Sequence, residues 1–225
     1  ALAGIGTWAA RPEEMGAMHD GYFNGLAAAL KRAGLNRPVL VVDRRRLEAN
    51  IAAIRRSTDA AKLPLRVVAK SLPAPQLLDT ILRGMGSQRL MVFSADMLRQ
   101  LLPLHPQADY LGGKPLPVSE FLRVVSDPRA DPGPRMQWLI DTPQRLSQYA
   151  EAAKARGMAL RVNLEIDVGL HRGGFADGAA LAEALGLARA AGIEVTGLMG
   201  YEPHVPKMPD ADAAWADAQG PYAKA

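Results

Sequence analysis

The chain has 225 residues and a formal net charge of +4, and 48% of its residues are hydrophobic and 22% charged. This length is sufficient for one α/β domain with a large core, and the composition is that of an ordinary globular protein. The basic residues are scattered and do not alternate with aromatic residues, so we expect no nucleic-acid partner. The chain has no cysteine, which excludes disulfides, thiolate zinc sites and cysteine nucleophiles.

Residues 1–36 are expected to form a tail and one helix ahead of the main domain, which we place at 37–225. The segment from Ala1 to Ala10 is apolar, rich in small residues and too short to span a membrane. It is either the remnant of an export signal or a disordered tail, so both a cytoplasmic and an exported, periplasmic location stay open. Phe23, Leu26 and Leu30 then recur at helical spacing.

Strands and helices alternate along the rest of the chain. Pro38 to Asp43 (PVLVVD) is a short apolar β-run, and six strands, each followed by an expected helix, come after it, at 65–70, 89–93, 109–112, 137–141, 160–166 and 194–199. Strict alternation predicts a parallel sheet with helices packed outside it. Six units favour a TIM-type (β/α)8 barrel, which typically takes about 250 residues, so we expect an incomplete barrel with an open seam.

Lys70 is the first candidate for chemistry. The segment from Leu65 to Ala69 is mostly apolar and β-favouring and leads directly into the lysine, and the chain turns at Ser71. A buried parallel strand would therefore deliver an amine to its carboxyl end, where α/β barrels place their active sites. A partly desolvated lysine there is a nucleophile toward an aldehyde, whereas the alternative is a surface lysine that merely follows a strand.

Two further strand ends carry unusual side chains. The loop after the fifth strand would place Asp167, His171 and Arg172 on the same face, and the sixth strand leads to Tyr201 and His204. Arg172 could instead only pair with Asp167 or Glu165, and His204 could be a satisfied surface histidine. The four histidines lack the close spacing of metal ligands, so no metal site is expected within this chain.

These motifs in this order resemble the alanine-racemase-like amino-terminal barrel of the fold-type III pyridoxal-phosphate enzymes. The branch that they resemble most is the D-threonine aldolase and D-serine dehydratase-like group. The resemblance covers roughly residues 36–210, and the motifs that carry it are PVLVVD at 38–43, LEANI at 47–51, VAK at 68–70, EIDVGLHRGG at 165–174 and GLMGYEPH at 197–204.

The resemblance implies pyridoxal 5'-phosphate as cofactor and a small D-amino acid as substrate. Lys70 would form a Schiff base with the cofactor and Arg172 would lie near its phenolic oxygen. Tyr201 and His204 would line or stack on the ring, His204 also as a catalytic residue, and Asp167 would belong to the cofactor site. Relatives of this kind are typically homodimers, and aldolases and dehydratases hold a divalent metal through a carboxyl-terminal domain that this chain does not include.

The chain also departs from the family pattern. Ser71 and Leu72 follow the lysine where the aldolases usually carry a Thr-His pair, and the last two strands, the glycine-rich phosphate cup and the β-domain are not in the sequence. The GLHRGG loop at 169–174 and the GYEPH segment at 200–204 look most like the aldolase and dehydratase branch, so a lyase, either an aldolase or a dehydratase, is our main hypothesis. The alternatives are an amino-acid racemase, a pyridoxal-phosphate carrier without turnover and an inactive fragment with an open seam.

Overall fold

A computed structural model describes residues 18–71, 74–129 and 131–224 of the chain. The chain separates into two compact units, 1–44 and 45–225. In the described part of the first unit, helix α2 (Gly21–Arg32) begins where the Asp20 carboxylate accepts a hydrogen bond from the backbone N–H of Phe23 at 3.0 Å. The hydroxyl of Tyr22 donates to Asp43 at 3.1 Å.

The β-run expected at 38–43 is not a strand, which corrects the sequence-based assignment. These six residues have no regular secondary structure, and Val39, Leu40, Val41 and Val42 are all exposed. A strand needs a neighbouring chain for its backbone hydrogen bonds, and no described segment pairs with this run. Apolar β-favouring composition alone was therefore insufficient to form a strand.

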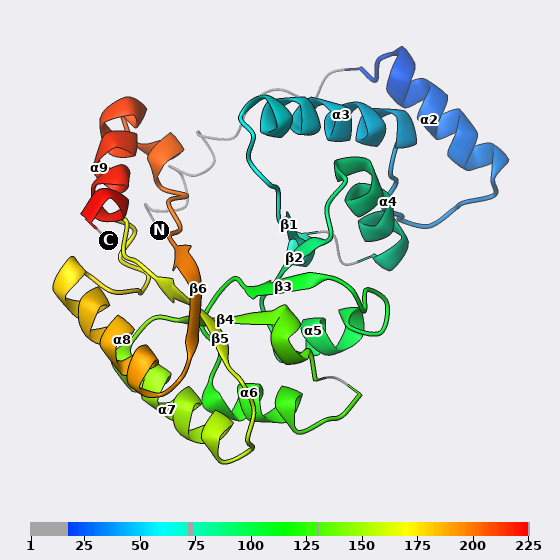
Figure 1. Cartoon of the computed structure of the whole chain (residues 1–225). Helices are drawn as coiled ribbons and strands as arrows, with labels where there is room; N and C mark the ends of the chain where they lie inside the picture. Colours follow the sequence, from blue (N-terminus) through cyan, green and yellow to red (C-terminus); the bar gives the residue numbers. More distant parts are fainter. Residues whose placement is uncertain (1–17, 72–73, 130, 225) are drawn as a thin grey trace, which may run out of the picture. The chain divides into compact units, whose positions relative to one another are not determined.

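The second unit is built on one six-stranded parallel sheet in the order β1-β2-β3-β4-β5-β6 (Figure 1). Each strand pairs with the next along the chain, and β1 and β6 do not pair with each other, so the sheet is an open barrel. The predicted incomplete barrel of six βα units is thus confirmed. The strands are β1 (Val67–Val68), β2 (Arg89–Val92), β3 (Asp109–Gly112), β4 (Met136–Ile140), β5 (Arg161–Glu165) and β6 (Glu194–Met199).

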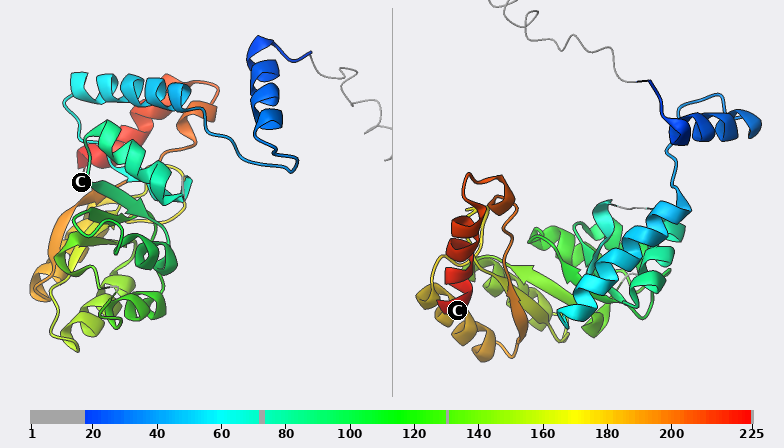
Figure 2. Two further views of the ribbon diagram at one scale, coloured as in Figure 1. Left: turned by 90° about the vertical axis from the view of Figure 1, so that its right-hand side faces the viewer. Right: turned by 90° about the horizontal axis from the view of Figure 1, so that it is seen from above.

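Helices alternate with these strands as expected. The consecutive helices α5 to α8 lie side by side outside the sheet (Figures 1 and 2). None of the helices in the described parts of the chain is long and apolar enough to cross a membrane. The helices of this unit are α3 (Arg44–Ala60, whose first residue belongs to the first unit), α4 (Pro75–Met85), α5 (Ala95–Leu101), α6 (Val118–Val125), α7 (Pro143–Lys154), α8 (Gly178–Ala190) and α9 (Ala211–Lys224), with short 3-10 turns η1 (Ala69–Ser71), η2 (Gly133–Arg135) and η3 (Val205–Lys207).

The core lies between the sheet and these helices. Alternate residues of each strand face it, because successive side chains of a strand point to opposite faces. Phe121 of α6, Trp138 of β4 and Tyr149 of α7 are each at most 2% exposed and pack ring against ring, with centroids 4.3 to 6.0 Å apart. This aromatic cluster packs α6 and α7 against β4 in the middle of the sheet. The loops at the ends of the strands are therefore attached to a well-packed core.

Polar side chains on the opposite face of the sheet form one hydrogen-bonded network. The side-chain nitrogen of Asn163 donates to Gln137 and to Thr196 at 2.7 Å each, and Gln137 donates to Asp109 at 2.7 Å. The guanidinium of Arg66 pairs with the Asp109 carboxylate at 2.9 Å. The network links residues on or beside β1, β3, β4, β5 and β6, so these polar side chains are hydrogen-bonded to one another.

Candidate functional site

Lys70 lies two residues beyond the carboxyl end of β1, because the strand is shorter than the predicted 65–70. Regular pairing ends at Val68, and the lysine belongs to the 3-10 turn η1. Lys70 is exposed rather than partly buried, because it lies beyond the end of an edge strand. Its Nζ lies 4.0 Å from the centroid of the Phe93 ring, and no carboxylate in the described residues pairs with it.

Arg172 is held from two sides. Its guanidinium pairs with the carboxylate of Glu165, the last residue of β5, whose side chain is only 3% exposed. Its Cζ lies 4.5 Å from the centroid of the Tyr201 ring, which follows β6. A buried carboxylate and an aromatic face therefore fix the guanidinium between two strand ends. Arg172 itself is 34% exposed on its side chain, so part of it remains accessible to a ligand.

Asp167 pairs with His171 and not with Arg172. The Asp167 Oδ2 and the His171 Nδ1 lie 2.7 Å apart, and Oδ1 accepts hydrogen bonds from the backbone N–H groups of Gly169 and His171. Partial burial raises the pKa of Asp167, but the hydrogen bonds from His171 and Gly169 outweigh it, and the net pKa is lowered. Asp167 is therefore an ionised carboxylate that fixes the loop after β5.

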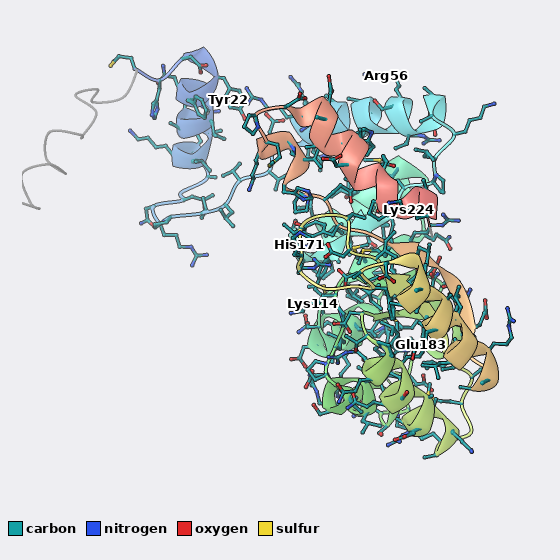
Figure 3. The ribbon with its side chains drawn as sticks, turned by 90° about the vertical axis from the view of Figure 1, so that its left-hand side faces the viewer. Tyr22, Arg56, Lys114, His171, Glu183 and Lys224 are labelled. Atoms are coloured by element: carbon teal, nitrogen blue, oxygen red, sulfur yellow. The ribbon has the colours of Figure 1, made fainter. Side chains whose placement is uncertain are left out.

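His204 follows β6 and lies against the same loop. Its Nε2 faces Gly169, and its buried Nδ1 has no hydrogen-bond partner among the described residues. Asp167, His171 and His204 share the wall of an open cavity of about 740 Å³ that residues of α9 line from the other side. Figure 3 shows His171 on the loop next to α9. This cavity is large enough for a small ligand, and His204 contributes an imidazole to its wall.

Tyr222 of α9 is a part of this region that sequence reasoning missed. Its hydroxyl lies directly over Gly200, where a side chain would collide with it and with Val168. Burial and the Glu202 carboxylate raise the pKa of the Tyr222 hydroxyl, so it remains protonated. Because Gly200 immediately precedes Tyr201, this contact ties α9 to the segment that carries two of the candidate residues. Only the glycine, which tolerates close approach, gave a signal in the sequence.

The structure thus brings the candidate residues together in three groups at the carboxyl ends of the strands. Lys70 and Phe93 form one group, Arg172 with Tyr201 a second, and Asp167 with His204 the third. The first lies on β1 and β2 and the other two on β5 and β6. Arg172 and Lys70 are thus near opposite edges of the open sheet.

The residues present suit pyridoxal phosphate. The cofactor needs an amine that can react with its aldehyde, a polar or charged group beside its ring and an aromatic or imidazole surface. An amine without an ion pair, a fixed guanidinium and an imidazole with a free nitrogen supply these properties here. In the part of the chain that the structure describes, no three histidine or acidic side chains cluster as metal ligands do.

Sequence comparison identifies the family. The model of the alanine racemase N-terminal domain matches residues 42–220, most of the chain. The chain therefore belongs to this family, which is the barrel of the fold-type III pyridoxal-phosphate enzymes, as the strand-end motifs predicted. Among the curated proteins compared with it, none matches significantly.

Solved structures show the same fold. D-threo-3-hydroxyaspartate dehydratase from Delftia sp. HT23 is 20% identical and superposes with a TM-score of 0.73, over 84% of this chain and 50% of that one. D-threonine aldolase from Filomicrobium marinum is also 20% identical, with a TM-score of 0.72 over 84% and 51%. Histidine racemase from Leuconostoc mesenteroides subsp. sake NBRC 102480 is 19% identical, with a TM-score of 0.62 over 77% and 46%. The chain spans about half the length of these proteins.

Proposed function

We propose that this chain is the cofactor-binding barrel of a pyridoxal-phosphate-dependent lyase that acts on a small D-amino acid with a β-hydroxyl group. The observation that carries the proposal is the arrangement of Lys70 and Arg172. An exposed amine without a carboxylate partner and a guanidinium fixed by a buried carboxylate both lie at the carboxyl end of one parallel sheet. That end is where parallel barrels carry out chemistry.

Each residue has a defined part in this proposal. Lys70 holds the cofactor through its Nζ and afterwards moves a proton at the substrate. Arg172 presents a positive charge to the cofactor's phenolic oxygen, and Glu165 keeps that charge in place. Tyr201 and His204 line the ring, Asp167 orders the loop that bears Arg172, and the free Nδ1 of His204 is the second group able to exchange a proton. When bound, pyridoxal phosphate supplies an electron sink for charge that develops at Cα.

The choice of a lyase over a racemase rests on the resemblance of the loops at 165–174 and 197–204. The closer superposition of the dehydratase and the aldolase, with TM-scores of 0.73 and 0.72 against 0.62 for the histidine racemase, supports the same choice. Loss of a β-hydroxyl and cleavage of Cα–Cβ both start from the same bound substrate, so the two reactions are separated by assay. We propose a homodimer as the active form, which light scattering of the purified protein can check.

The test is an absorption spectrum of the protein with pyridoxal phosphate. We expect a visible band that borohydride removes in the parent and in Lys114→Ala, a variant of another exposed lysine after a strand. Lys70→Ala should lack the band. D-threonine, D-serine and alanine are then supplied as substrates: glycine with acetaldehyde indicates an aldolase, pyruvate from D-serine a dehydratase and the opposite enantiomer of alanine a racemase. A band of equal size in Lys70→Ala would refute the proposed role of Lys70. If the parent shows the band but converts none of these substrates, the pyridoxal-phosphate carrier is the hypothesis that remains.

A further inference from the structure

Phe93 and Gly113 form a contact beside Lys70 that the proposed function does not use. Phe93 follows β2 and is partly buried, and Gly113 follows β3 and is buried. The backbone N–H of Gly113 donates to the carbonyl of Val92 at 2.8 Å, which joins the two strand ends. A Cβ atom on Gly113 would collide with the Phe93 ring, so the ring lies flush on the glycine backbone.

The ring presents its face to the lysine. Nζ of Lys70 lies 4.0 Å from the ring centroid, within the distance at which an ammonium is attracted to an aromatic face. No carboxylate in the described chain competes for this amine. In the described residues, the Lys70 nitrogen therefore interacts with the Phe93 ring and not with a carboxylate.

We propose that Phe93, seated on Gly113, is a positioning residue that gives Lys70 a resting place in the cofactor-free protein. This inference rests on the proposed role of Lys70. The ring holds the ammonium at the end of β1 and covers one side of it. An incoming aldehyde therefore reaches the nitrogen from the uncovered side, and other electrophiles meet a partly shielded amine. Gly113 is required because any larger residue would push the ring out of this position.

The test measures how accessible Lys70 is without any cofactor. The protein is treated briefly with trinitrobenzenesulfonate at neutral pH, and mass spectrometry gives the modification of Lys70 relative to Lys154, an exposed lysine at the end of α7. Phe93→Leu should raise this ratio about two- to fivefold, the population change that a cation–π contact of an exposed group is worth. Phe93→Tyr keeps the aromatic face and should leave the ratio at the parent value.

Two further variants separate position from packing. Gly113→Ala keeps the ring but displaces it, and should raise the ratio as Phe93→Leu does. Phe93→Met fills a similar volume without a π face and should do the same if leucine at this position prevents folding. An unchanged ratio in the folded leucine or methionine variant, or an equal rise in Phe93→Tyr, would overturn the inference. The labelling is done without pyridoxal phosphate. Its outcome is therefore independent of the absorption spectrum that tests the proposed function, and either inference can fail without the other.

Discussion

The pair formed by Glu165 and Arg172 permits a quantitative test of how the site is held. The two partners are unequally buried, with side-chain exposures of 3% and 34%. Arg172→Met would leave a buried carboxylate without its partner, which typically costs about 3 kcal/mol or more in the free energy of unfolding. Glu165→Gln leaves a guanidinium that water can reach, so we expect a loss of about 1 kcal/mol. The arginine variant should therefore be the less stable of the two.

Urea unfolding followed by circular dichroism gives the free energies of unfolding for the parent, both single variants and the double variant. The double variant should be more stable than Arg172→Met alone, since it replaces the unpaired carboxylate by a neutral amide. The coupling free energy from this cycle should be about 1 to 2 kcal/mol. Equal losses in the two single variants, or a coupling below about 0.5 kcal/mol, would refute the reasoning that a buried carboxylate fixes the arginine.

Two other predictions concern the loops around the cavity. Tyr222→Phe removes the hydroxyl that lies over Gly200, so hydrogen exchange of residues 200–204 should become faster, while Trp215→Phe, a change at an exposed position of the same helix, should not alter it. Equal exchange in the two variants would contradict this contact. Asp167 has a lowered pKa in the folded protein, so its ionised form adds stability above the ordinary value of 3.8, and this contribution is lost as the pH falls through the folded pKa. The stability of the parent relative to Asp167→Asn should thus be greatest at and above pH 5 and shrink toward acid pH. A difference that grows on acidification would contradict it.

The order of the strands and the residues at their ends were predictable because they depend on local patterns. Short apolar runs alternate with helical periodicity, and parallel pairing then brings Lys70, Arg172 and Tyr201 to one end of the sheet. The alternative interpretation of Arg172 named Asp167 or Glu165 as its ion-pair partner, and in the structure the partner is Glu165. Such predictions succeed because neighbouring elements in the sequence are also neighbours in space.

The remaining features depend on contacts that a sequence does not reveal. The apolar run at 38–43 forms no strand because strand formation is decided by a partner. Lys70 was expected to be partly buried, and this was wrong: the lysine is exposed. The burial of a residue at the end of an edge strand depends on which segments pack beyond that strand, and the local sequence does not reveal them. The contact of Phe93 with Gly113 depends on the register of β2 against β3, and Tyr222 reaches Gly200 through the placement of α9.

The most direct test of the central claim is a peptide map of the protein after incubation with pyridoxal phosphate and reduction with borohydride. Reduction makes the link between the cofactor and an amine permanent, so mass spectrometry of the digest identifies the lysine that formed it. The account predicts a modified peptide that contains Lys70, at one cofactor per chain, and no corresponding modification in Lys70→Ala. Modification spread over surface lysines such as Lys154, with the Lys70 peptide left unmodified, would contradict it.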